Sequence, residues 1–206
     1  MDLGIKGRKA IVCASSQGLG LACAMSLARE GCTVFINGRD ESRLDRAVRE
    51  IEAVTGPRAT QVVADINTDA GRAKLVVACP EADILINNNA GPTPGELKDW
   101  DHAAWLVALE ANMLAPILLI RALLPGMRQR RFGRIVNITS AMVKSPRAHM
   151  GLSTAARARI VETIAAKRFG RPEEFGDACA YLCSAQAGFI SGQNLQLDGG
   201  SYRGLV

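Results

Sequence analysis

The residues best suited to binding a dinucleotide lie at the first turn of the chain. An apolar run ending at Ala14 is followed by serines, a glutamine and two glycines, and an apolar helical pattern begins at Leu19. In such a strand–helix turn Gly18 lets the backbone approach a pyrophosphate, and Gly20 lets the helix pack closely on the strand. The free N–H groups at the helix start then face the phosphates. We therefore predict a phosphate-binding turn made of Ser15, Ser16, Gln17, Gly18, Leu19 and Gly20.

The end of the next apolar run bears on which dinucleotide is bound. In nucleotide-binding folds of this type an acid ~20 residues on holds the ribose hydroxyl of NAD, whereas an arginine nearby accommodates the 2′-phosphate of NADP. Arg39 lies 19 residues after Gly20, and the following Asp40 and Glu41 fit a helix cap and first turn. The sequence therefore favours NADP(H) over NAD(H). The alternative is that Arg39 is only a solvated loop charge.

These residues need a scaffold in which strands alternate with helices, and the hydrophobic pattern predicts one. Such an alternation predicts a doubly wound parallel sheet of the Rossmann type, an α/β fold with helices on both faces. The predicted strands are 9–14, 33–37, 59–64, 83–86 and 134–138, and the predicted helices are 19–30, 41–54, 69–78, 100–109 and 113–130.

Length and composition agree with one α/β domain spanning residues 1–206. A length of roughly 100–200 residues per domain is usual, and no repeat or linker divides this chain. Apolar residues make up 48% and aromatic residues only 4%. The core must therefore be built from Ala, Val, Leu and Ile, a mixture typical of a buried parallel sheet.

Three other classes of function are disfavoured. The six cysteines form no Cys-x-x-Cys pair and have no histidine cluster nearby, so we expect reduced, buried thiols and no metal site. The start of the chain shows no signal pattern. The most apolar stretch, Met113 to Leu124, is interrupted by Pro116 and Arg121 and falls short of the ~20 residues of a membrane span. We expect a cytoplasmic protein without membrane contact.

The chain carries a net charge of +5, with its densest basic run at 128–131. Neither interleaved aromatic residues nor a nucleic-acid-binding motif accompanies the run, so no nucleic-acid partner is expected. The run fits a helix end whose cations offset the negative end of the helix dipole before Gly133. A weaker role, attracting phosphorylated substrates or the cofactor, stays open.

Motifs along the chain resemble, in order, those of the short-chain dehydrogenase/reductase family, close to its 3-oxoacyl carrier-protein reductases. The resemblance covers nearly the whole chain. It implies that Asp65, with Ile66 beside it, binds the adenine, that Asn88, Ala90 and Gly91 adjoin the cofactor, and that the protein forms a homodimer or homotetramer. The matching segments are the turn 13–20, Asp65, Asn88-Asn89-Ala90-Gly91, Asn112, the strand 134–140, the helix start 170–174, and the closing strand in 190–193 and 197–200.

The resemblance also assigns the catalytic positions, and here the chain departs from the family. Asn112 matches the asparagine of the family's proton relay, and Ser140 matches the serine that holds the substrate oxygen. The family's Tyr-x-x-x-Lys is replaced by Ser153 and Arg157. Arginine can still bind the cofactor ribose but is a poor proton shuttle, because it stays charged at any working pH.

Two other sources could supply the proton that the missing tyrosine would give. Lys144 and His149 lie in the segment after Ser140, and water could be relayed through Asn112 and Ser140. An ordinary solvated loop is the alternative reading for Lys144 and His149.

A second departure is the short distance between Arg157 and Gly170. The 12 intervening residues cannot hold the family's sixth strand, substrate lid and crossover, because a parallel crossover alone takes at least ~10–12 residues. Either the protein is shortened in 158–169, or a longer form exists whose extra residues join near Ala158–Arg159. We expect the longer form.

Together these observations predict an NAD(P)-dependent oxidoreductase that interconverts a carbonyl and a secondary alcohol, with a small ketone or a 3-oxoacyl thioester as substrate. The alternative, which Ser153 and Arg157 favour, is a cofactor-binding pseudoenzyme that acts as a sensor or an assembly partner.

Overall fold

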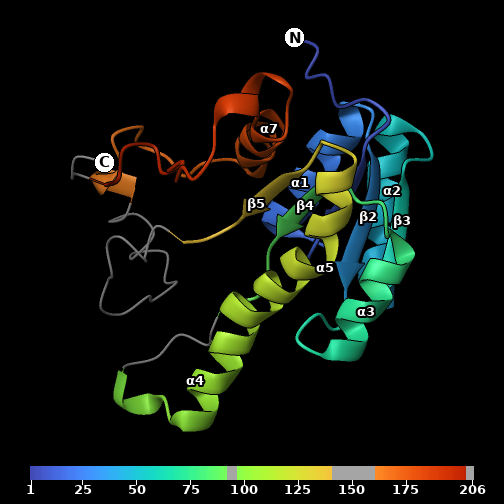
Figure 1. Cartoon of the computed structure of the whole chain (residues 1–206). Helices are drawn as coiled ribbons and strands as arrows, with labels where there is room; N and C mark the ends of the chain where they lie inside the picture. Colours follow the sequence, from blue (N-terminus) through green and yellow to red (C-terminus); the bar gives the residue numbers. More distant parts are fainter. Residues whose placement is uncertain (92–96, 141–160, 203–206) are drawn as a thin grey trace.

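Five parallel strands form the central sheet of the computed structural model, which describes residues 1–91, 97–140 and 161–202. Their spatial order is β3-β2-β1-β4-β5, so the chain winds outward from β1 in both directions (Figure 1). The predicted doubly wound sheet is confirmed, with strand ends shifted by one or two residues. The strands are β1 (Lys9–Val12), β2 (Thr33–Gly38), β3 (Ala59–Val63), β4 (Ile84–Asn87) and β5 (Arg134–Asn137).

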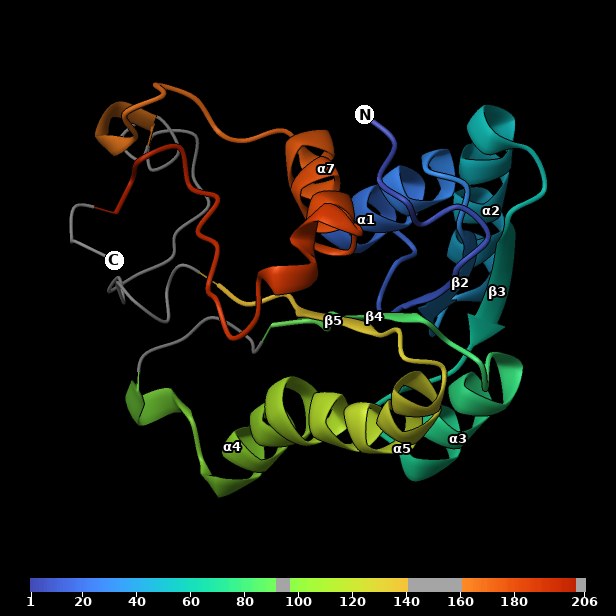
Figure 2. The ribbon, with the colours of Figure 1, turned by 45° about the horizontal axis from the view of Figure 1, so that its top comes forward.

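Helices cover both faces of the sheet. Figure 2 shows α1, α2 and α7 on one side and α3 and α5 on the other. Because successive side chains of a strand point to opposite faces, Val12 packs into the first layer and its neighbour Ile11 into the second. The helices are α1 (Gly18–Arg29), α2 (Glu41–Thr55), α3 (Asp69–Ala78), α4 (His102–Leu109), α5 (Ala115–Gln129) and α7 (Pro172–Leu182), with short 3₁₀ turns η1 (Leu97–Asp99) and η4 (Gln186–Phe189).

The core is built from small and branched apolar side chains, as the low aromatic content predicts. All six cysteines are free thiols within it. Cys23 on α1 lies in the same buried cluster as Cys179 and Cys183 on α7, so these thiols pack as small hydrophobic groups between the two helices.

The basic run lies at the end of α5, as predicted for a helix terminus. Arg128 is in its last turn. Arg130 donates from Nε to Asp83 Oδ1 at 3.3 Å and from Nη2 to the Ala82 carbonyl at 2.7 Å. Arg130 therefore ties α5 to the start of β4.

The two helices predicted over 100–130 form one continuous helical rod. A π-helical turn, η2 (Glu110–Leu114), joins α4 to α5, and α4 reaches beyond the sheet (Figure 1). Pro116 does not break the rod, although proline lacks an N–H and crowds the carbonyl four residues back. The wider turn just before it relieves that clash.

The rod is longer than the apolar stretch Met113 to Leu124, on which the expectation of no membrane span rested. Residues His102–Gln129 are long and apolar enough to cross a membrane, and their most apolar 18 residues have a mean hydropathy of 1.9 and are 17% buried. Length and composition alone are weak evidence, because core helices of soluble proteins pass the same test. One side of α5, through Ala115, Leu119 and Leu123, is buried against the protein.

The closing strand expected in residues 190–200 does not form. Leu195 and Leu197 are 52% and 48% exposed in an irregular segment, and the sheet of the described residues ends at β5. A strand needs a neighbour, and the sixth strand that the family places between β5 and the closing strand is not supplied by the described residues. Without that sixth strand, the closing segment has no neighbouring strand edge to pair with.

Candidate cofactor and active site

The glycine turn is held in place by buried polar contacts. Ser15 is fully buried, and its Oγ donates to the Val12 carbonyl at 2.6 Å and accepts from the Asn37 backbone N–H at 3.0 Å. A Cβ on Gly20 would lie 2.4 Å from the Ala14 carbonyl oxygen, so only glycine fits there. Gly18 has φ +62° and open space around its Cα. The predicted roles of both glycines, close helix packing and an open approach, match this geometry.

The N-terminus of α1 lacks the side-chain cap that three other helices have. The side chains of Asp40, Thr68 and Asp101 cap α2, α3 and α4 by accepting backbone N–H bonds at 2.9–3.0 Å. Gln17, at the same position of α1, makes no such bond, and Gly18 is exposed. The first turn of α1 therefore presents N–H groups and the positive end of the helix dipole to an anion. A dinucleotide pyrophosphate fits this cradle.

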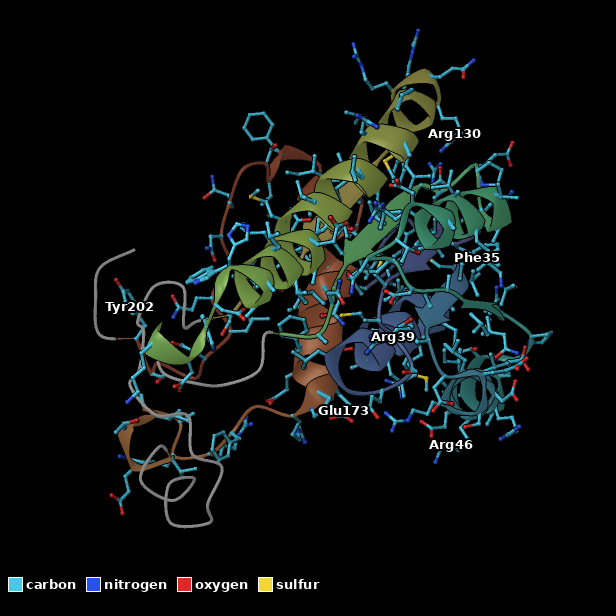
Figure 3. The ribbon with its side chains drawn as sticks, turned by 90° about the horizontal axis from the view of Figure 1, so that it is seen from below. Phe35, Arg39, Arg46, Arg130, Glu173 and Tyr202 are labelled. Carbon is cyan, nitrogen blue, oxygen red and sulfur yellow. The ribbon has the colours of Figure 1, made fainter. Side chains whose placement is uncertain are left out.

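The loop after β2 places Arg39 close to the glycine turn. A Cβ on Gly38 would meet the Ser16 side chain at 3.4 Å, so the two loops touch. Arg39, labelled in Figure 3, is 70% exposed, and its Nη1 lies 4.0 Å from Asp65 Oδ2. The carboxylate of Asp40 is engaged by Ser42 Oγ and the Arg43 N–H, and both contacts lower the pKa of Asp40. Arg39 is thus an exposed cation on the loop directly after β2, and the acid that follows it is occupied.

The loop after β4 is fixed by three consecutive asparagines. Asn87 donates to Asn137 Oδ1 at the end of β5 at 2.8 Å, and Asn88 donates to the Ala14 carbonyl in the glycine turn at 3.1 Å. Asn89 donates to Asn67 at 2.8 Å and to the Ala111 carbonyl at 2.9 Å. The ends of β1, β4 and β5 and the loop after β3 are thus tied together. Ala90 and Gly91 follow at the exposed edge of this junction.

The predicted adenine contacts lie directly after β3. The backbone N–H of Asn67 donates to Asp65 Oδ1 at 3.0 Å, which fixes the carboxylate in its own turn. Ile66 is 6% exposed and packs in the second core cluster. Asp65 therefore lies on a firm loop at the same edge of the sheet as the glycine turn.

Two of the four predicted catalytic residues can be placed. Ser140 is exposed and follows β5 by three residues, and β5 pairs in parallel with β4. Asn112 lies exposed in the π-helical turn, with Nδ2 donating to the Ala108 carbonyl at 3.0 Å. Ser153 and Arg157 lie outside the described residues, as do Lys144 and His149.

Sequence reasoning missed the buried polar residue Asn37. Its side chain is 1% exposed and donates to the Val62 and Ala64 carbonyls at 3.1 and 3.0 Å. The signal was present, because an asparagine at the end of an apolar strand must find partners once it is buried. Arg72, in the middle of α3, was missed in the same way.

No cluster of three or more His, Cys, Asp or Glu side chains suited to a metal ion occurs in residues 1–91, 97–140 and 161–202.

Comparison with known proteins identifies relatives along the whole chain. The profile of a family described as short chain dehydrogenase matches residues 8–167, and one described as Enoyl-(Acyl carrier protein) reductase matches 147–202. An uncharacterized oxidoreductase, YvaG, of Bacillus subtilis is 36% identical over 155 residues, which cover 73% of this chain and 57% of that protein. The dehydrogenase/reductase SDR family member 4 of Bos taurus is 28% identical over 246 residues, covering 96% of this chain and 88% of that protein.

Solved structures share the same architecture. L-sorbose reductase from Gluconobacter frateurii, in complex with NADPH and L-sorbose, aligns with a TM-score of 0.91 and 25% identity over 100% of both chains. A 7α-hydroxysteroid dehydrogenase in complex with NADH aligns with a TM-score of 0.90 and 22% identity, over 97% of this chain and 96% of that chain.

The bovine alignment also shows a difference in length. It extends over 246 residues, whereas this chain has 206, so at least 40 positions of the alignment have no counterpart here.

Proposed function

This chain belongs to the short-chain dehydrogenase family of NAD(P)-dependent oxidoreductases, and we propose that it uses NADP(H) to interconvert a carbonyl and a secondary alcohol. The observation that carries the proposal is the uncapped start of α1, where Gly18 leaves open space before the first N–H groups of the helix and Gly20 lets the helix pack closely on β1. An open anion site at a helix start is suited to the pyrophosphate of a dinucleotide.

The preference for NADP(H) rests on Arg39. Its guanidinium lies on the loop after β2, with Ser16 on the adjoining loop, and the neighbouring acid Asp40 is occupied in capping α2. An arginine binds a phosphate through charged, planar hydrogen bonds, whereas a free acid at this point would repel a 2′-phosphate. The ion pair of Arg39 with Asp65 is long and exposed, so a phosphate can replace it at little cost.

At the substrate end Ser140 and Asn112 are the residues we assign to the reaction. Bound nicotinamide supplies or accepts the hydride. Ser140 donates a hydrogen bond to the substrate oxygen, and Asn112 orders the water through which a proton reaches that oxygen. Arg157 binds the cofactor ribose, and Ser153 stands where the family places its proton donor. Small ketones and 3-oxoacyl thioesters are the substrates to try first.

A cofactor-binding pseudoenzyme is the second candidate, and one observation favours it. Among the described residues the sheet stops at β5, and the segment expected to close it, with Leu195 and Leu197, forms no strand. We propose that the 40 or more positions without a counterpart fall between Arg157 and Gly170 and include the family's sixth strand and substrate lid. A form of the chain without them keeps the dinucleotide site and lacks a wall for the substrate.

The test is a pair of titrations followed by turnover assays. NADPH and NADH binding are measured by fluorescence for the wild type, for Arg39→Ala and for Arg46→Ala, which removes the same charge from the exposed face of α2. Arg39→Ala should weaken NADPH binding about 10- to 100-fold, the value of one or two charged hydrogen bonds, and leave NADH binding unchanged. Arg46→Ala should change neither affinity. Equal weakening of both cofactors in Arg39→Ala would contradict the NADP preference.

Turnover separates the enzyme from the pseudoenzyme. NADPH oxidation is followed with a panel of ketones and 3-oxoacyl thioesters, with Ser140→Ala alongside. Turnover that is lost in Ser140→Ala while NADPH still binds supports the reductase. Tight binding of NADPH without turnover on any substrate supports the pseudoenzyme, and no binding at all contradicts both.

A further inference from the structure

The π-helical turn that carries Asn112 is held from outside by two polar contacts. Glu110 Oε1 accepts from Arg72 Nη1 at 2.7 Å, and the Ala111 carbonyl accepts from Asn89 Nδ2 at 2.9 Å. These are the two residues immediately before Asn112, and one is bound to α3 and the other to the loop after β4. A π turn is rare and less regular than the α-helix around it, so its place in the helix depends on such tertiary contacts.

Arg72 is the central residue of this arrangement. It is 8% exposed, on α3. Besides Glu110, its guanidinium donates to the Ile66 carbonyl at 2.8 Å and to Asp69 Oδ1 at 2.5 Å. Burial lowers the pKa of Arg72, but the hydrogen bonds and charges of Asp69 and Glu110 outweigh it and the pKa is raised. The side chain therefore remains a fixed cation between the loop after β3 and the rod.

The two carboxylates that bind Arg72 are not equivalent. The side chain of Asp69 is 97% exposed, so its pair with Arg72 is screened by water and contributes little. Glu110 is 31% exposed and faces an arginine side chain that is 10% exposed, so its contact is partly desolvated and directional. Only the Glu110 contact reaches the turn that carries Asn112.

We propose that Arg72, through Glu110, is a positioning residue that sets where Asn112 stands relative to the cofactor. The inference rests on the proposed function in assigning a proton relay to Asn112. The same guanidinium contacts the Ile66 carbonyl, next to Asp65 at the predicted adenine site. Arg72 thus holds the loop that carries Asp65 and the turn that carries Asn112 at a fixed separation from each other.

The experiment compares Glu110→Gln with Asp69→Asn, because each neutralises one carboxylate partner of the same arginine. Hydrogen exchange of the backbone amides, read by peptide mass spectrometry, is measured with and without NADPH. In Glu110→Gln, exchange over residues 110–115 should accelerate at least about tenfold, while α1 and α2 keep wild-type rates. Asp69→Asn should leave residues 110–115 at wild-type rates.

Kinetics adds a measurement that a merely structural contact would not change. Because a misplacement of about 1 Å at a reacting group can cost up to ~10²-fold, kcat should fall 10- to 100-fold in Glu110→Gln, with the KM for NADPH within twofold. The same loss should be absent in Asp69→Asn.

Three results would overturn the inference. They are wild-type exchange over 110–115 in Glu110→Gln, accelerated exchange spread evenly over α3 and α5, or equal effects of the two variants. Because the exchange experiment works on the cofactor-free protein, it decides the matter even if NADPH does not bind. A failure to bind NADPH would count against the proposed function alone.

Discussion

Around β1, β2 and β4 the large apolar side chains are buried almost without exception, whereas from β5 onward many are half-exposed. We call residues 1–91 the cofactor side, and residues 130–140 with 161–202 the substrate side. On the cofactor side Ile11, Ile36 and Ile86 have 0% exposure. On the substrate side the apolar residues of β5 are only partly buried, and Leu197 is 48% exposed.

The difference follows from how a parallel sheet is stabilised. A central strand has a neighbour on each side and a helix on each face, so its apolar residues are removed from water in all directions. β5 has β4 on one side and no strand on the other in the described part of the chain. β1, β2 and β4 therefore have a strand on each side, whereas the second edge of β5 depends on residues beyond it.

The largest expected effect comes from removing a buried leucine on each side. Leu27→Ala, in the fully buried face of α1, should lower the free energy of unfolding by about 2–5 kcal/mol, because it loses burial and leaves a cavity. Leu197→Ala should change it by no more than about 0.5 kcal/mol. The free energies of unfolding of both variants and of the wild type are measured by chemical denaturation.

A large loss in Leu197→Ala would break the comparison. It would mean that the segment 190–198 is packed in solution, for example against a second copy of the chain.

The reactivity of the cysteines toward iodoacetamide reports how firmly α7 is held against α1 on the cofactor side. Burial raises the pKa of Cys13 and of Cys32 to about 12, and it raises the pKa of Cys79 to about 11. Thiols react as thiolates, so these three should stay unmodified by iodoacetamide at pH 8 until the cofactor side unfolds. Cys179 and Cys183 are equally buried, but only because α7 lies on α1.

The measurement is the order in which the cysteines are labelled as the urea concentration is raised, and peptide mass spectrometry identifies the labelled residues. If the substrate side is less stable, Cys179 and Cys183 should be labelled before Cys13. Labelling of all thiols at one urea concentration would show that α7 and the cofactor side unfold together. NADPH should delay the labelling of Cys13 if it binds at the glycine turn.

The sequence predicted the cofactor side well because its signals are local. Apolar strand runs, the cap at Asp40 and the glycines of the first turn each determine structure within a few residues, and α3 lies within the residues predicted for it. The family resemblance added the right order of elements.

The failures were all matters of long-range pairing. The closing strand in 190–200 was predicted from a motif, but a strand forms only if its neighbour is present. The single rod 102–129 was predicted as two helices, 100–109 and 113–130, because no local rule foresees the π turn that joins them. Arg72 was overlooked because its partner Glu110 is 38 residues away.

The smallest expected effect concerns the entry to α7. Arg168 donates two bonds to Glu174, at 2.8 and 2.7 Å, and the Arg171 N–H donates a third at 2.8 Å. The Arg168 hydrogen bonds, followed by the backbone bond from Arg171, lower the pKa of Glu174 from 4.5 to about 2. A carboxylate with a lowered pKa in the folded state stabilises the protein above pH 4.5, and the contribution is lost as the pH falls toward 2.

Glu174→Gln should therefore lower the Tm by no more than a few degrees at pH 7, since the pair is exposed. The difference from the wild type should shrink steadily below pH 4.5. Glu173→Gln is the matched control, because it removes an acid from the same first turn and leaves the Arg168–Glu174 pair intact. If the Tm difference is the same at pH 7 and pH 3, the ion pair does not stabilise the entry to α7. The position of α7 would then depend on its packing against α1 and not on this pair.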